Sequence, residues 1–100
     1  MVDEKQYKFD EGKFLDECRA YIDSTYSEHY AGKAGTNKNI QLMELLGAND
    51  VAFKFAQGAA MKYTLRYGKK GGFNKKDLLK AMHYLIFMSY YTPEGDDEVK

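Results

Sequence analysis

The sequence predicts an all-α protein, a small helical domain of three main helices plus one short helix. Apolar residues recur at helical spacing in four separate segments, strand-like alternation is nearly absent, and glycines and asparagines stand between the segments. A chain of 100 residues has the length of one domain. We therefore expect its helices to share a single small core.

The first helix is expected to begin after Asp10 and to end near Ser24. An apolar stripe runs along it, formed by Phe14, Leu15, Cys18, Tyr21 and Ile22. Residues 1–28 also carry eight acidic side chains: Asp3, Glu4, Asp10, Glu11, Asp16, Glu17, Asp23 and Glu28. Residues 1–28 are thus predicted to be an acidic, amphipathic N-terminal helix.

A loop and a short helix follow. Residues 28–39 contain two glycines and two asparagines but no aliphatic side chain larger than alanine, which predicts a loop. The short helix is expected from Ile40 to Leu46, with Gly47 as its C-terminal cap.

The third helix is expected from Val51 to Tyr67, with Asn49 or Asp50 as its N-terminal cap and Gly68 as its end. Gly58 inside it lowers helix propensity, so we expect a neighbouring helix or a ligand to approach closely there. One side of this helix collects Val51, Phe55, Ala59 and Leu65.

The last helix is expected from Lys75 to Tyr91, capped by Asn74 and ended by Thr92-Pro93. One face gathers Leu78, Leu79, Met82, Leu85, Ile86 and Ser89. Residues 29–91 would then form the helical core, and residues 92–100 an acidic flexible tail. Aromatic side chains make up 15% of the chain, more than this core can bury, so we expect homo-oligomers.

Composition excludes several classes of protein. No apolar stretch is long enough to cross a membrane, and the polar start after Met1 does not read as a secretory signal. The single cysteine excludes an internal disulfide and a cysteine-cluster zinc site, and two distant histidines do not predict a metal centre. A Walker-type phosphate loop is absent. These features fit a cytoplasmic protein without a resident metal.

Charge is unevenly distributed, although the formal net charge is zero. Residues 53–80 carry eight basic side chains against Asp77 alone: Lys54, Lys62, Arg66, Lys69, Lys70, Lys75, Lys76 and Lys80. This asymmetry predicts an anionic partner for the middle of the chain. Pairing with the acidic N-terminal helix, within the chain or across an oligomer, is the alternative.

The strongest candidate site lies within this basic stretch. Lys62 and Arg66 are four residues apart, which places both cations on one helix face. Lys69 or Lys70 would extend this line into a glycine turn with free backbone amides, and Asn74 begins another helix. Lys80 belongs to the same constellation, and Tyr63, Tyr67 and Tyr84 lie nearby in the sequence. Such groups suit a nucleotide, since cations hold phosphate and rings can stack on a base. A solvated basic face is an equally good interpretation of these residues alone.

Four blocks of the sequence resemble the SaV-like family of small bacteriophage proteins. They are His29-Tyr30, Ile40-Gln41, the block Gly58-x-x-x-Lys62-Tyr63-x-x-Arg66-x-Gly68-x-Lys70, and the block Asp77-Leu78-x-Lys80-Ala81-x-x-Tyr84-Leu85. Two positions depart from the family pattern. Ala59 replaces the usual asparagine, and His83 replaces the usual tryptophan.

The resemblance implies a phage protein that handles phosphorylated nucleotides in the host cell cytoplasm, because the family includes a nucleotide kinase that assembles into a ring. It implies nucleotide- or phosphate-binding roles for the matched residues and their basic neighbours, with Asp77 as a supporting residue. These candidates are His29, Tyr30, Lys62, Tyr63, Arg66, Lys69, Lys70, Lys80 and Tyr84.

Three functions are consistent with the sequence. The preferred hypothesis is a protein that binds a phosphorylated nucleotide, including cyclic nucleotides, and sequesters a signal of host antiviral defence without needing a cofactor. The alternative is a nucleoside monophosphate kinase, which would need Mg²⁺ and a nucleoside triphosphate. A nucleic-acid-binding protein is the second alternative, disfavoured by the zero net charge.

Overall fold

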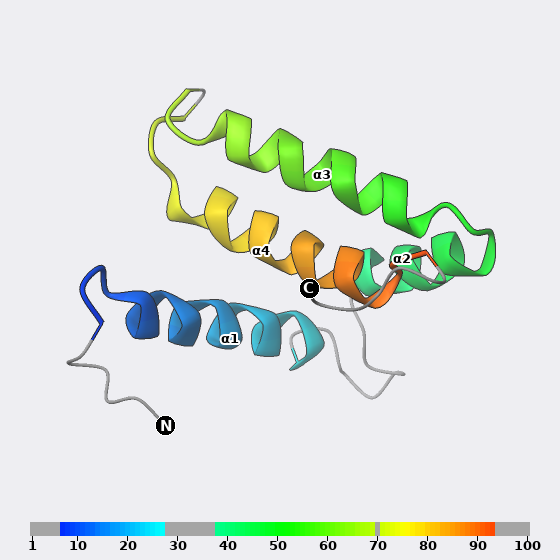
Figure 1. Ribbon diagram of the computed structural model, residues 1–100, viewed down its shortest axis with the longest axis horizontal. Coiled ribbons are helices and arrows are strands. Elements are labelled where there is room, and N and C mark those ends of the chain that lie inside the picture. The colour runs from blue at the N-terminus through cyan, green and yellow to red at the C-terminus, as the bar shows by residue number, and fades with distance from the viewer. Residues whose placement is uncertain (1–6, 28–37, 70, 94–100) are drawn as a thin grey trace. The chain divides into compact units, whose positions relative to one another are not determined.

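The computed structural model describes residues 7–27, 38–69 and 71–93 (Figure 1). Within these ranges it contains four α-helices and no strand, which confirms the predicted all-α class. The helices are α1 (Glu11–Ser27), α2 (Lys38–Ala48), α3 (Ala52–Arg66) and α4 (Lys75–Tyr90). By its contacts the chain divides into two units, Met1–Asn37 and Lys38–Lys100. The first unit contains α1, and the second contains the other three helices.

Helix α1 begins where its sequence predicts but continues three residues past Ser24. The hydroxyl groups of Ser24 and Thr25 donate to the carbonyl oxygens of Tyr21 and Ile22, at 2.6 Å and 2.8 Å. Hydroxyls bonded back to the preceding turn do not compete for the next backbone amides, so the helix can continue to Ser27.

Helix α2 ends two residues later than predicted, and Gly47 lies inside it. The amide of Val51 donates to the carbonyl of Leu46, and the amide of Asp50 donates to that of Gly47. Asp50 supplies the left-handed residue of this Schellman motif, with φ of 60°. The prediction that Gly47 caps α2 is therefore wrong.

Gly47 is needed for a different reason. A Cβ atom at this position would lie 2.5 Å from a carbon of the Tyr91 ring. The Tyr91 hydroxyl donates to the carbonyl of Met43, at 3.3 Å, and this bond ties the end of α4 to α2. The glycine thus makes room for an aromatic ring from a distant helix.

Helices α3 and α4 lie side by side (Figure 1) and contact one another through residues of unequal size. The buried residues of α3 are Ala52, Ala56 and Ala60. Large side chains from the other helices, namely Leu46, Tyr84, Phe87, Met88 and Tyr91, pack against the core formed by Met43, Ala52 and Ala56. Small residues on one helix therefore leave space for rings on the other.

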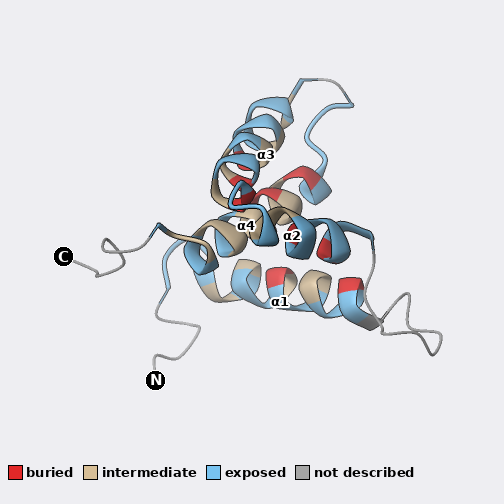
Figure 2. Ribbon diagram, turned by 90° about the vertical axis from the view of Figure 1, so that its right-hand side faces the viewer, coloured by how far each residue is buried: buried red, intermediate tan, exposed pale blue. Residues whose placement is uncertain are grey.

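The structure overturns three expectations for α3. Val51 and Leu65 are exposed, and Phe55 is 40% exposed although its ring meets that of Tyr84, so the predicted apolar side is mostly unpacked. Much of α3 is accordingly coloured as exposed in Figure 2. Gly58 is also exposed, and a Cβ atom there would meet nothing within 4 Å. No close approach within the described part of the chain explains that glycine. Neither Asn49 nor Asp50 caps α3, because its N-cap residue is Val51, without a side-chain bond.

Helix α4 has the predicted start, but its predicted apolar face is not the buried one: Leu85, Ile86 and Ser89 are exposed, and the buried residues are Asp77, Ala81 and His83. The Asn74 side chain accepts a hydrogen bond from the Lys76 amide at 3.0 Å, which confirms Asn74 as the N-cap. None of the helices in the described segments is long and apolar enough to cross a membrane.

Candidate anion-binding site

Helix α3 presents two cations and a ring near its C-terminal end. Lys62 and Arg66 are one helical turn apart, and Tyr63 lies between them in the sequence. Lys62 is exposed, and about half of the Arg66 side chain is exposed. Both cationic groups are therefore open to a ligand from solvent.

Helix α4 brings a third cation to the same place. The Lys80 ammonium lies 5.3 Å from the centre of the Tyr63 ring, and the Lys62 ammonium lies 4.7 Å from it. Both distances are within the range of attraction between a cation and an aromatic ring. Ammonium groups from two helices thus both lie near the Tyr63 ring.

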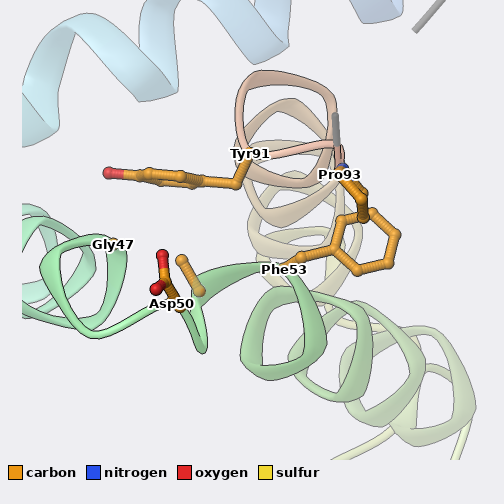
Figure 3. Close-up of a pocket in the computed structure, with 6 residues that line it drawn as sticks. Gly47, Asp50, Phe53, Tyr91 and Pro93 are labelled. Atoms are coloured by element: carbon orange, nitrogen blue, oxygen red, sulfur yellow. The ribbon is translucent and has the colours of Figure 1, made fainter. Parts of the chain in front are cut away.

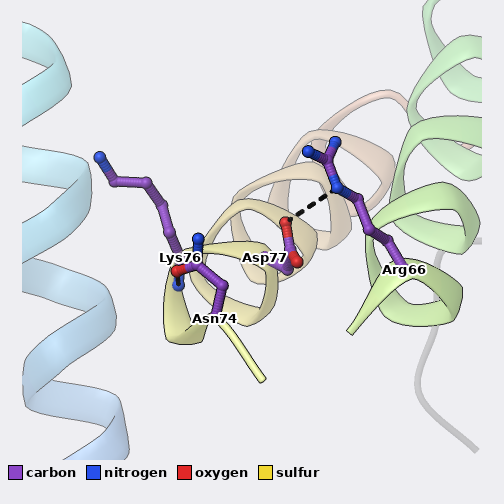
Figure 4. Close-up of polar contacts among 4 residues, drawn as sticks. All are labelled: Arg66, Asn74, Lys76 and Asp77. Atoms are coloured by element: carbon purple, nitrogen blue, oxygen red, sulfur yellow. Dashed lines mark hydrogen bonds and ion pairs between the residues drawn. The ribbon is translucent and has the colours of Figure 1, made fainter. Parts of the chain in front are cut away.

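Asp77 faces Arg66 across the two helices (Figure 4). Its Oδ1 atom lies 3.8 Å from the Arg66 Nε atom, which is ion-pair distance but longer than a hydrogen bond. Asp77 is buried, and the contact uses only the Nε atom of the guanidinium. The carboxylate can therefore orient Arg66 while the two Nη atoms serve an external anion.

The tyrosines of the site pack on each other. The Tyr63 and Tyr84 rings are stacked, with centroids 6.0 Å apart and planes 12° apart. The Tyr84 ring also meets the edges of Phe55 and Phe87, at 6.2 Å and 5.7 Å. These contacts occupy much of both tyrosine rings, so the arrangement favours holding the cations in place over stacking a base.

We name the set of Lys62, Tyr63, Arg66, Asp77, Lys80 and Tyr84 the α3–α4 clamp. With Asp77 ionised, its three cations leave two net positive charges. Such a group can bind a phosphate dianion without a metal ion. Among the described residues, no group of three histidine, cysteine or acidic side chains could hold a metal ion.

A family model described as a protein of unknown function, DUF3310, matches residues 24–86. The chain belongs to the DUF3310 family. The matched segment contains every residue of the clamp, so the site lies within the family's domain. No curated protein and no solved structure matches this DUF3310 chain.

The structure brings together six of the site residues that were predicted from the sequence of this DUF3310 protein. These six are the residues of the α3–α4 clamp. Lys69 lies beyond the end of α3 and is exposed; its amide donates to the Arg66 carbonyl, but no side-chain contact within the described residues joins it to the clamp. His29, Tyr30 and Lys70 lie outside the described residues.

The glycine turn after α3 does not supply the free amides that we expected. The amides of Gly68, Lys69 and Gly72 donate to the carbonyls of Gly72, Arg66 and Lys69. These bonds close the turn on itself. The predicted phosphate contacts from these three amides are therefore wrong, because the turn uses them internally.

The N-terminal end of α4 is similarly occupied. Asn74 accepts from the amides of Lys76 and Asp77, through its side chain and its carbonyl. Figure 4 shows the Lys76 side chain pointing away from Arg66. Lys80, one turn later, is the lysine of α4 that reaches the clamp.

Sequence reasoning missed the two phenylalanines that support Tyr84. Phe55 is seven residues before Lys62 in the same helix, and Phe87 is three residues after Tyr84. The signal for Phe87 was its helical spacing from Tyr84 and Lys80, which places all three on one side of α4.

His83 is buried, and its ring is stacked on that of Phe87 with the centroids 4.5 Å apart. Burial lowers the pKa of His83 below the usual value of 6.5. The imidazole is thus held as the neutral form at neutral pH.

Proposed function

We propose that this protein binds a phosphorylated nucleotide through the phosphate-binding cations of the α3–α4 clamp. The observation that carries the proposal is the meeting of Lys62 and Lys80 at one ring, 4.7 Å and 5.3 Å from its centre. Arg66, one turn along α3, adds a planar donor that suits phosphate oxygens.

The size of the clamp favours a compact ligand. Its three cations come from two adjacent helices, and two of them lie near a single tyrosine, whereas nucleic-acid binding uses a basic surface that follows many phosphates. The formal net charge of zero also weighs against a polynucleotide. A mononucleotide with one to three phosphates matches this local charge.

The proposed biological role rests on the resemblance to the SaV-like phage family. All four blocks of that resemblance lie within residues 24–86, the segment that the family model matches. We propose that the protein acts in the host cell cytoplasm as a homo-oligomer and sequesters a nucleotide signal of antiviral defence.

The burial of Asp77 and its ion pair with Arg66 favour nucleotide binding without phosphoryl transfer. Phosphoryl transfer needs carboxylates that hold Mg²⁺ between donor and acceptor. Asp77 is buried and directed to Arg66, at 3.8 Å, which suits a role in orienting the arginine. A nucleotide kinase remains the alternative that product analysis separates from simple binding.

The test is a calorimetric titration with mono-, tri- and cyclic nucleotides, with and without Mg²⁺, followed by chromatography of the recovered ligand. We expect saturable binding and an intact nucleotide. Release of a new phosphorylated product would instead establish the kinase.

Arg66→Ala should weaken the binding roughly 10- to 100-fold, because a charge-assisted contact contributes about 1.5–3 kcal/mol. Arg66→Lys should restore part of this loss, since lysine lacks the planar fork. Lys75→Ala is the matched control and should have a small, salt-screened effect. Equal losses in Arg66→Ala and Lys75→Ala, both removed by high salt, would show a diffuse basic surface instead of a clamp.

A further inference from the structure

A second concave feature lies at the other end of α3, where α2, α3 and the end of α4 meet. It is a hollow of about 270 Å³ lined by Gly47, Asp50, Ala52, Phe53, Tyr91 and Pro93 (Figure 3). Phe53 and Lys62 are nine residues apart in α3, which corresponds to about 13 Å along the helix axis. The hollow is therefore separate from the clamp.

The aromatic wall of the hollow is fixed in place. The Tyr91 ring fills the space left by the missing side chain of Gly47, and its hydroxyl donates to the Met43 carbonyl at 3.3 Å. The Tyr90 ring meets the Tyr91 ring edge-on, with centroids 4.9 Å apart. These contacts hold the Tyr91 ring ready for a ligand, so little side-chain entropy is lost on binding.

Asp50 supplies the one charged group among the lining residues. Its backbone is held in the left-handed region, with φ of 60°, by the turn between α2 and α3. Its carboxylate does not cap α3 and has no hydrogen bond or ion pair with other described residues. Figure 3 shows this carboxylate on the side of the hollow that faces Tyr91.

We infer that this hollow binds a small alkylammonium cation. The carboxylate of Asp50 would neutralise the charge, and the rings of Phe53 and Tyr91 would contact the alkyl groups around it. An anion would be repelled by Asp50, and a neutral apolar molecule would gain no attraction from this exposed carboxylate.

The test uses choline as the probe in a nuclear magnetic resonance titration at constant ionic strength. We expect saturable shifts of the ring signals of Phe53 and Tyr91. The neutral isostere 3,3-dimethylbutan-1-ol should bind at least about fivefold more weakly, because it lacks the charge that attracts rings and carboxylate.

Asp50→Asn is the decisive variant, because asparagine tolerates the left-handed backbone and keeps the shape of the side chain. It should weaken choline binding about 5- to 30-fold. Glu44→Gln is the matched control, since it removes one negative charge from an exposed position on α2 that does not line the hollow. That variant should bind choline as the original chain does.

Three results would overturn the inference. They are the absence of saturable shifts with choline, equal affinity for choline and its neutral isostere, and equal loss of affinity in Asp50→Asn and Glu44→Gln. Circular dichroism of each variant confirms that a change in binding does not come from loss of the helices.

Discussion

The Tyr63 ring explains how two positively charged lysines can both lie in the clamp before an anion binds. Two ammonium groups near one point repel each other, and the face of an aromatic ring offsets part of that repulsion. The Lys62 and Lys80 ammoniums lie 4.7 Å and 5.3 Å from the Tyr63 ring centre. The ring therefore positions the cations, while the anion itself is held by the charges.

This role of Tyr63 predicts a difference between two substitutions. Tyr63→Leu removes the ring and should weaken nucleotide binding about 5- to 30-fold, because each ammonium loses about 0.5–1 kcal/mol of attraction. Tyr63→Phe keeps the ring and should change the affinity by less than about twofold. Calorimetric titration of both variants measures this, and equal losses would show that the hydroxyl, and not the ring, is what matters.

His83 predicts a dependence of stability on pH. Burial lowers its pKa in the folded protein, whereas the unfolded chain keeps a value near 6.5. Just below pH 6.5 the unfolded state therefore binds a proton that the folded state does not. The free energy of unfolding should fall as the pH decreases from 7.5 to 5.5, and above pH 7.5 this contribution should be constant.

Urea unfolding of the original chain and of His83→Phe measures this effect. Phenylalanine keeps a ring beside Phe87 but cannot titrate, so the variant should lose less stability between pH 7.5 and 5.5. Acidic side chains titrate in both proteins and cancel in the comparison. Identical pH profiles would assign the dependence to those acidic groups.

At the scale of helices, the packing of α3 on α4 is set by size. Ala56 and Ala60 face the partner helix, while the bulkier Phe55 and Leu65 of the same helix are exposed. Alanines allow the axes to approach closely, and Tyr84 and Phe87 of α4 pack against the core that contains Ala56.

Two glycines in this region should respond oppositely to the same substitution. Gly58→Ala should raise the free energy of unfolding by about 0.5–1 kcal/mol, because the position is exposed, helical and without a neighbour within 4 Å. Gly47→Ala should lower it, because the new methyl group would lie 2.5 Å from the Tyr91 ring. Urea unfolding of both variants checks the signs.

If Gly58→Ala stabilises the free chain but weakens nucleotide binding or self-association, then a ligand or partner approaches α3 at that glycine. If Gly58→Ala instead destabilises the free chain, then Gly58 does not have the exposed, uncrowded position that the structure gives it.

These helices also show how far the sequence could predict the fold. Asn74 was predicted as a cap correctly, because capping depends on amides two and three residues away. Gly47 was assigned the wrong role because its neighbour Tyr91 comes from another helix. The buried face of α3 was missed because a search for large apolar residues selects Phe55 and Leu65, whereas close packing selected the alanines.

The candidate site was predictable to a similar extent. The shared face of Lys62 and Arg66 follows from helical spacing alone. Their meeting with Asp77, Lys80 and Tyr84 depends on how two helices pair, which no local pattern determines. The free amides expected in the glycine turn were wrong because such turns often satisfy their own backbone groups, as Gly68 and Gly72 do here.

At the scale of the whole molecule, apolar surface remains exposed on the side of α3 away from its buried alanines. Met61 and Leu65 are one helical turn apart there and are 56% and 62% exposed. Exposed apolar residues side by side mark an interaction surface more often than residues that stand alone.

We therefore expect the protein to self-associate, with a mass by light scattering above the 11.5 kDa of a single chain. Leu65→Glu should lower that mass, because it introduces a charge into the apolar contact. Lys69→Glu, a larger change of charge at an exposed polar position, is the control and should leave the mass unchanged. A single-chain mass at micromolar concentration would contradict the prediction.

The short turn between α3 and α4 has a kinetic consequence. Tyr67 and Phe73 pack edge to face at 5.3 Å, and the backbone bonds of Gly68 and Gly72 close the chain between them. Every member of the clamp therefore lies within a single pair of consecutive helices, so its contacts have a low contact order. Small loop-closure entropy favours rapid pairing of such helices, typically within microseconds to milliseconds. After dilution from urea, the phosphate-binding cations should be reassembled as soon as this one hairpin forms.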